Sequence, residues 1–367
     1  RDARAGAVPE ASSSFSPCRG DGRASERRCR RCGTALPVGD ASGDPCWRCL
    51  LALRLGSGGA SAEAAPERVG AFRVVDTLAS TAGTLTCLAE DGEGRRVTLQ
   101  VLDPAEDADA VRARLEAEGT RLGRVSHPAV ATRVEVVDSG EGQLWIATDW
   151  VPGVPVTELC DRECLTIPQR LELMVEVCEA LEHLHAAGVL HLDLRPSRVL
   201  VTVEQDRPRA RIVGCGVARA LDQKLSEDVL YAPAGVPGEE LGCSAPERLD
   251  LSATPDARAD VCALGAILYE LLTGALPFEP QRLRRARWDE ILRILREELP
   301  PPPSARVASL APDVSSAAAA RRRLEPRAWT RALRGDLDWI VLKALEKDPA
   351  ARHPSARALG HDLERHL

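Results

Sequence analysis

The stretch from Val189 to Ala218 constrains the fold of this 367-residue chain more than any other. Two short β-branched runs, Arg198–Val203 and Arg211–Val213, flank a polar turn. Two such runs around a turn predict a β-hairpin. The loop that leads into the first run is rich in polar groups, with His191 and Asp193 among them. We therefore expect the chain to be organised around this loop and hairpin.

The composition indicates a globular protein that can bury a sizeable core. Hydrophobic residues make up 44% of the chain and charged residues 28%, and the formal net charge of −7 disfavours a dedicated nucleic-acid binder. No run of about 18 apolar residues occurs, so we expect no membrane span. The 12 cysteines are too few for a disulfide scaffold, which favours a cytoplasmic location. The chain begins at Arg1 without a signal-peptide pattern, and we interpret it as a fragment of a longer protein.

Two C-x-x-C pairs lie near the N-terminus, Cys29/Cys32 and Cys46/Cys49, separated by thirteen residues. Four thiolates at this spacing can close a tetrahedral Zn²⁺ site, and we predict a structural zinc site here. So short a module would fold only with the free energy of metal binding. The alternative is a pair of turns without metal, either reduced or disulfide-linked. The basic cluster at Arg27–Arg31 is interpreted as a solvated face.

Periodicity predicts a small strand-rich part followed by a larger helical part. Strand-like runs occur at Gly70–Leu78, Thr84–Ala89, Arg96–Leu102, Ala129–Val137 and Leu144–Trp150. Helices are predicted at 103–124, 168–187 and 261–272. The segment at about 300–335 is polar and rich in Ala and Arg, and we interpret it as a surface insertion.

The motifs in and after the central loop occur in the order that the protein kinase family uses. His191-Leu192-Asp193 stands where that family writes H-R-D, Gly214-Cys215-Gly216 where it writes D-F-G, and Ala245-Pro246-Glu247 matches its A-P-E. The helix around Asp260 and the closing run G-D-L-D-W-I-V-L-K-A-L-E-K-D-P are also similar. From about Ala71 to Leu367 the chain resembles the bacterial serine/threonine protein kinases.

The resemblance implies an α+β fold of two lobes, preceded by a small zinc ribbon. Composition and cysteine spacing set the first expected boundaries: a disordered segment 1–17, a zinc-ribbon-like module 18–54 and a flexible linker 55–70. The resemblance sets the others: a β-rich N-lobe 71–151 and a helical C-lobe 152–367 with an insertion at about 300–335. In such kinases the Asp of H-R-D receives the proton of the substrate hydroxyl. A loop Asn and the Asp of D-F-G hold the Mg²⁺ ions.

Several positions that face the nucleotide in the family have a different chemistry here. Arg198 stands at the position of the metal-binding Asn, and Gly214 at that of the metal-binding Asp. Gln100 replaces the strand lysine that grips the phosphates, and no lysine precedes Lys224. The glycines of the family's phosphate-binding loop are missing between Leu78 and Thr86. The resemblance therefore implies a kinase fold without its metal site, which argues against the binding of ATP with Mg²⁺.

Other positions of the family's nucleotide site persist by resemblance. Glu118 matches the helix glutamate that pairs with the missing lysine, so it is expected either to bond Gln100 or to remain a solvated carboxylate. Thr148 matches the gatekeeper residue of the family. The remaining matches are the hinge residues Asp149 and Val151, and Leu200 in the hairpin.

The positions that hold the family's fold are also kept by resemblance. Asp260 is expected to orient the backbone of the loop that contains His191 and Asp193. Arg352 is expected to pair with Glu247 in a buried salt bridge.

These retained and lost positions lead us to predict a catalytically impaired pseudokinase that acts as a binding or allosteric signalling module. Its expected partners are proteins, such as an active kinase or another signalling component. Two alternatives stay open. One is an active or weakly active ATP-dependent serine/threonine kinase, because strongly non-additive sites can retain residual turnover. The other is a sensor that binds nucleotide without metal, because the hinge persists.

Overall fold

The computed structural model describes residues 66–81, 84–102, 108–138, 143–204, 207–221, 238–249 and 253–367. The predicted zinc module, with Cys29, Cys32, Cys46 and Cys49, lies outside these ranges, as does Lys224. No helix in these ranges combines the length and apolarity that crossing a bilayer requires.

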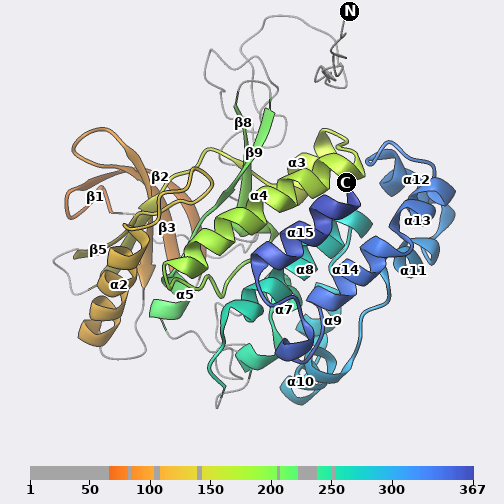
Figure 1. Ribbon diagram of the computed structural model, residues 1–367. Coiled ribbons are helices and arrows are strands. Elements are labelled where there is room, and N and C mark those ends of the chain that lie inside the picture. Colours follow the sequence, from red (N-terminus) through yellow and green to blue (C-terminus); the bar gives the residue numbers. More distant parts are fainter. Residues whose placement is uncertain are drawn as a thin grey trace, which may run out of the picture.

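Six antiparallel strands form the sheet of the small lobe, on the left in Figure 1. They are β1 (Arg68–Val69), β2 (Phe72–Thr81), β3 (Thr84–Glu90), β4 (Arg96–Leu102), β5 (Val134–Asp138) and β6 (Leu144–Asp149), in the order β1-β2-β3-β4-β6-β5. One face buries Phe72, Leu99 and Trp145 in a core of its own. Because paired residues of neighbouring strands share a face, Gln100 and Ile146 lie together on the opposite one.

Helix α2 (Ala108–Leu122) covers that opposite face. Val111 and Leu115 lie four residues apart, on one side of the helix, and cluster with Leu144 and Ile146 of β6. Gly119 weakens the helix by its backbone entropy. Its lack of a side chain is nevertheless needed, since a Cβ there would lie 2.7 Å from the carbonyl oxygen of Val134.

The large lobe is helical and is built around α8 (Ala257–Thr273), which is buried along almost its whole length. Asp256 caps its first turn by accepting from the backbone N–H of Arg258, and Gly274 ends it with φ 84°. The helices around it are α3 (Val156–Arg162), α4 (Ile167–Ala186), α7 (Gly238–Cys243), α9 (Pro280–Arg285), α10 (Trp288–Glu297), α11 (Pro303–Ala308), α12 (Pro312–Ala320), α13 (Pro326–Leu333), α14 (Asp336–Ala344) and α15 (Ala356–His366). In Figure 1, α4, α14 and α15 pack around α8.

The predicted hairpin is present at the junction of the lobes. Strand β8 (Val199–Glu204) pairs with β9 (Arg207–Ile212) and, on its other side, with β7 (Val154–Pro155). The short 3₁₀ helix η1 (Pro196–Arg198) leads from the central loop into β8. The loop and the hairpin are therefore fixed by a three-stranded sheet that also holds the segment after β6.

The interpretation of residues 300–335 as a surface excursion is wrong. The segment forms α11, α12 and α13, and it contributes Val307, Trp329 and Leu333 to the main core of the large lobe. Its Ala- and Arg-rich composition hid this role, because the apolar positions are few and widely spaced. The indole N–H of Trp329 donates to the carbonyl of Leu272 at 2.9 Å, which ties α13 to the end of α8.

Two buried arginines complete the C-terminus of α8. Arg322 donates to the carbonyls of Leu271 and Leu272, each at 2.9 Å, and Arg170 of α4 donates to the carbonyl of Leu271 at 3.1 Å. The last carbonyls of a helix have no partner within it, so these bonds satisfy groups that would otherwise be buried unpaired. Burial, and the neighbouring Arg170 guanidinium, lower the pKa of Arg322 to about 10, which leaves it charged at neutral pH.

Candidate functional site

The carboxylate of Asp260 in α8 holds the backbone of the loop that contains His191 and Asp193. This carboxylate accepts from the backbone N–H groups of His191 at 2.9 Å and Leu192 at 2.7 Å, and it contacts His185 Nε2 at 2.9 Å. Leu192 has φ 60°, a left-handed conformation that is costly for a branched side chain. Burial would raise the pKa of Asp260, but the His185 contact and these N–H donors hold it below its ordinary value. The ionised Asp260 thus stabilises a strained loop backbone, as the resemblance implied.

His191 is a buried structural member of this loop. Its Nδ1 accepts from the backbone N–H of Asp193 at 3.2 Å, so Nε2 carries the proton and donates to the carbonyl of Val213 at 3.1 Å. Burial lowers the pKa of His191, which favours the neutral ring that this tautomer requires. The histidine therefore joins the loop to the end of the hairpin.

Asp193 is paired with arginines. Its Oδ2 accepts from Arg198 Nε at 3.0 Å and lies 2.9 Å from Arg198 Nη2, and Arg195 Nε lies 3.4 Å from its Oδ1. Burial would raise the pKa of Asp193, but the two guanidiniums outweigh it and lower the pKa to about 2. A carboxylate held ionised in this way is a poor proton acceptor at neutral pH.

The Arg198 side chain occupies the space beside Gly214. Gly214 has φ 80°, and a Cβ built on it would lie 3.0 Å from Arg198 Nη1 and 3.3 Å from its Cζ. The position that carries a metal-binding carboxylate in the family therefore faces a guanidinium here. Arg198 and Gly214, which replace the family's two metal ligands, therefore lie next to each other in the structure.

Glu240 of α7 and Arg248 extend this charged cluster. Glu240 lies 3.8 Å from Arg195 and 3.8 Å from Arg248. Burial, together with the neighbouring Asp193, raises the pKa of Glu240. We call Asp193, Arg195, Arg198, Glu240 and Arg248 the loop charge cluster. It contains three guanidiniums and two carboxylates, so its arginines supply the positive charge that offsets both acids.

Glu118 does not bond Gln100. Its Oε1 accepts from Arg121, one turn further along α2, and lies 3.5 Å from Arg219 Nε, while its Oε2 has no hydrogen-bond partner among the described residues. Only 3% of Glu118 is exposed, so it is not a solvated carboxylate either. Both expectations for this residue are wrong, because the buried carboxylate is partnered by Arg121 and Arg219 and not by Gln100 or by water.

The hinge positions and Leu200 of the hairpin contact other parts of the protein. Val151, Leu200 and Val213 cluster together, and Leu200 is fully buried. Thr148 pairs with Thr98 in the sheet, and the Asp149 carboxylate accepts from the backbone N–H of Arg133 at 3.0 Å. The hinge side chains are thus engaged with the protein itself.

The salt bridge that the resemblance implied between Glu247 and Arg352 is present. Arg352 Nη1 and Nη2 donate to Glu247 Oε1 and Oε2 at 2.7 and 2.8 Å, in a bidentate geometry. This pair fixes η2 (Pro246–Leu249), which follows α7, to the loop before α15.

Sequence reasoning missed Arg195, Arg219 and Arg248 at the site, and it also missed His185. The basic residues of this chain are nearly all arginine. The residue type therefore does not show which of these arginines are buried at the site and which are exposed. His185 lies on the apolar side of its helix, and its spacing from the buried positions was the one clue to a buried contact.

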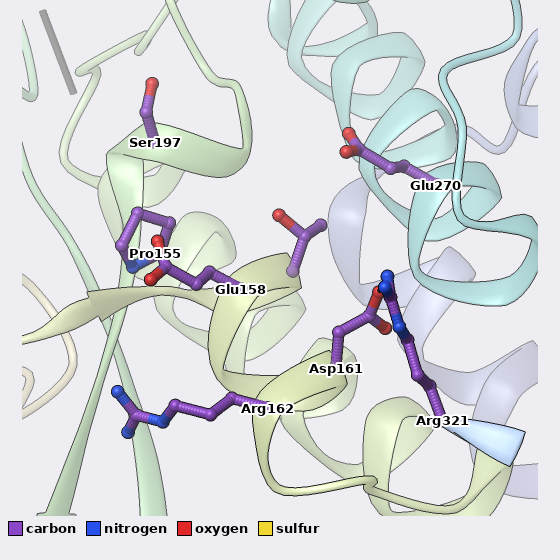
Figure 2. Close-up of a pocket in the computed structure, with 8 residues that line it drawn as sticks. Pro155, Glu158, Asp161, Arg162, Ser197, Glu270 and Arg321 are labelled. Carbon is purple, nitrogen blue, oxygen red and sulfur yellow. The ribbon is translucent and has the colours of Figure 1, made fainter. Parts of the chain in front are cut away.

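A cavity of about 580 Å³ lies in the C-lobe, lined by parts of α3 and α8 and by Ser197 of η1, the residue before Arg198. Glu158 and Asp161 of α3, Glu270 of α8, and Arg162 and Arg321 contribute its charges. Figure 2 shows Arg321 and Asp161 turned toward one another, and Arg321 Nη1 lies 3.1 Å from Asp161 Oδ2. Acidic and basic groups are mixed in this lining, so its charge alone assigns no ligand.

The side chains at the family's two Mg²⁺-binding positions do not supply the oxygen ligands that this ion prefers. Mg²⁺ prefers carboxylate and other oxygen ligands, whereas Arg198 and Gly214 offer a cation and a hydrogen atom. The remaining carboxylate, Asp193, is already neutralised by arginines. Within the described ranges, no group of three or more His, Cys, Asp or Glu side chains is arranged to hold a metal ion.

Comparisons with known proteins agree with this architecture. A family model described as protein kinase domain matches residues 81–363. The serine/threonine-protein kinase PknB of Mycobacterium tuberculosis is 30% identical over 280 residues, which cover 74% of this chain and 38% of PknB. A probable serine/threonine-protein kinase of Corynebacterium efficiens is also 30% identical over 280 residues, or 74% of this chain and 37% of that protein. The chain thus spans less than half the length of these relatives.

Solved structures show the same fold. Two crystal structures of the PknI kinase domain of Mycobacterium tuberculosis, one of them a mutant, superpose with TM-scores of 0.53 and 0.55 at 24% identity. Each match covers 83% of this chain and 99% of the PknI domain.

Proposed function

The chain belongs to the protein kinase family, and from this premise we propose that its kinase domain is a catalytically impaired pseudokinase that acts as a binding or allosteric signalling module. The observation that carries the proposal is Arg198. Its guanidinium lies beside Gly214 and pairs with Asp193. One side chain thereby fills the space of a metal ligand and neutralises the carboxylate at the family's catalytic position.

Phosphoryl transfer depends on positioning and on neutralising phosphate charge, with little covalent chemistry left to the protein. A site without its metal ligands and without the phosphate-binding lysine loses the groups that supply this stabilisation. In other enzymes, removing a single hydrogen-bond donor that stabilises the transition state typically lowers the rate by a factor of about 10²–10³. Membership of the family accounts for the fold, whereas Gln100, Arg198 and Gly214 argue against phosphoryl transfer.

An active serine/threonine kinase is the second candidate, and the retained Asp193 and His191 favour it together with the kinase relatives. We expect transfer of labelled phosphate to a generic substrate to be at least about a thousandfold slower than with PknB under the same conditions. Transfer at a rate near that of PknB would establish the active kinase and overturn the proposal.

Nucleotide binding is tested separately by thermal unfolding. A ligand at about a hundred times its dissociation constant adds about 2.7 kcal/mol to stability, so a bound nucleotide would raise the Tm clearly. We expect Mg-ATP to leave the Tm unchanged. An equal increase with and without EDTA would instead support a metal-independent nucleotide sensor, and an increase that needs Mg²⁺ would contradict the proposal.

We also propose that residues 18–54 bind one structural Zn²⁺ through Cys29, Cys32, Cys46 and Cys49. The support is the paired C-x-x-C spacing alone. Metal analysis of protein purified without chelators should give one zinc per chain, and Cys29→Ser should abolish it. Retention of zinc in that variant, or its absence from the parent protein, would contradict this assignment.

A further inference from the structure

A short helix, α5 (Val217–Ala220), lies directly after the Gly214-Cys215-Gly216 turn and packs against the small lobe. In Figure 1 it lies beside the end of α4, close to α2. Buried Ala220 clusters with Val111 and Leu115 of α2 and with Leu144 and Ile146 of β6, and Val217 and Leu221 pack against the same cluster. A helix that begins in the large lobe therefore packs against the small one.

Polar contacts fasten α5 to both lobes. Arg114 of α2 donates through Nε to the carbonyl of Ala220 at 2.8 Å. Arg219 lies with its Nε 3.5 Å from Oε1 of Glu118 in α2, and its Nη1 donates to the carbonyl of Gly188, just beyond α4, at 2.6 Å. One guanidinium thus bridges an element of the small lobe and an element of the large lobe.

The turn before α5 allows an unusually close approach to α2. Gly216 has φ 74°, and a Cβ built on it would lie 3.3 Å from the Cβ of Glu118 and 3.4 Å from Cδ1 of Leu122. A side chain at this position would be strained by its backbone and would press on α2. The glycine therefore permits the contact that places Arg219 next to Glu118.

The contact between α5 and α2 also includes an ion pair, because Glu118 carries a charge. In kinases that glutamate pairs with a strand lysine, whose place is taken here by Gln100. Arg121 and Arg219 are the cations within reach of the buried carboxylate among the described residues. Since Arg121 belongs to α2, as Glu118 does, Arg219 is the partner that links Glu118 to another element.

We propose that α5 is a latch that locks the two lobes into one fixed arrangement, held by Arg219, Arg114 and the apolar side of α5. The position of α2 is then set from the segment after the Gly214-Cys215-Gly216 turn, and it does not depend on a nucleotide in the cleft. The latch goes beyond the proposed function. It rests on contacts between elements, so transfer and nucleotide assays neither support nor overturn it.

Hydrogen exchange of the full chain tests the latch, with Arg219→Ala compared against Arg211→Ala. The two arginine side chains are matched in exposure, at 39% and 36%, and each pairs with a glutamate, but the partner of Arg211 is the exposed Glu204. We expect the amides of α2 to exchange about tenfold faster in Arg219→Ala, while those of α15 keep their rate. Arg211→Ala should leave α2 unchanged. Unchanged α2 exchange in Arg219→Ala, or equal acceleration in both variants, would overturn the latch.

Two further variants keep the test decisive if Arg219→Ala folds poorly. Glu118→Gln retains the shape of the side chain and removes its charge, and the double variant Glu118→Gln/Arg219→Ala should accelerate α2 exchange no more than Arg219→Ala alone. Gly216→Ala should accelerate α2 exchange with all the charges intact. Multiplicative effects of the Glu118 and Arg219 changes would show that the two side chains act independently, which the latch excludes.

Discussion

Replacing Arg352 with alanine is expected to lower the free energy of unfolding by about 3–5 kcal/mol, because removing one partner of a buried ion pair leaves the other charge uncompensated. Only 3% of Arg352 is exposed. Besides its two bonds to Glu247 at 2.7 and 2.8 Å, it donates to the carbonyls of Arg258 at 2.8 Å and Glu346 at 2.7 Å. Equilibrium unfolding in urea measures the loss as a lower midpoint at constant slope.

The chain offers a matched control for this prediction. Arg282 makes a bidentate contact with Glu298, at 2.8 and 2.9 Å, but its side chain is 43% exposed. Exposed pairs are screened by water and contribute at most about 1 kcal/mol. Arg282→Ala should therefore cost far less than Arg352→Ala. Similar losses in the two variants would mean that burial does not decide the strength of the Glu247 pair.

The second large effect is expected for Asp193→Asn, which we predict to destabilise the fold by about 3 kcal/mol. The neutral amide would leave the Arg195 and Arg198 guanidiniums with Glu240 as the remaining acid of the loop charge cluster. Asp193 is buried, so water cannot fully replace its charge. Urea unfolding measures the loss, with Asp289→Asn on an exposed ion pair as the control.

The pH dependence of this loss follows from the pKa of Asp193. The pKa is lowered from 3.8 to about 2 in the folded protein, so the carboxylate contributes its stability above pH 3.8, and this contribution disappears as the pH falls through about 2. The difference between the parent protein and Asp193→Asn should therefore shrink as the pH falls below about 4. A stability unaffected by the substitution would indicate that Asp193 serves chemistry alone, as in an active enzyme.

Much of the fold was predictable from the sequence because its signals are local. The alternation in β3 and β4, the apolar run of α8 before Gly274, and the two runs of the hairpin each follow a period of two or of 3.6 residues. The ordered motifs around Asp193 supplied the long-range arrangement, which periodicity alone cannot give. The error at 300–335 arose because Trp329 and Arg322 act through burial in an otherwise polar segment.

The site was predictable only in part. The substitutions at 198 and 214 are visible in the sequence, but their proximity in space is not: that the Arg198 guanidinium takes up the space beside Gly214 follows from the chain path through η1 and β9. Glu118 shows the same limit. The sequence identified a glutamate without its lysine, whereas its partner Arg219 lies about a hundred residues away, in an element four residues long.

The buried arginines at the end of α8 also bear on how the protein is made. The carbonyl of Leu272 receives its donors from Arg322 and Trp329, which lie 50 and 57 residues later in the chain. During synthesis α8 leaves the ribosome well before these residues do, so its final turn is incomplete until α13 has been translated. Stalling of the nascent chain in that interval would leave an apolar helix exposed without the residues that cover and cap it, which makes the chain prone to aggregation.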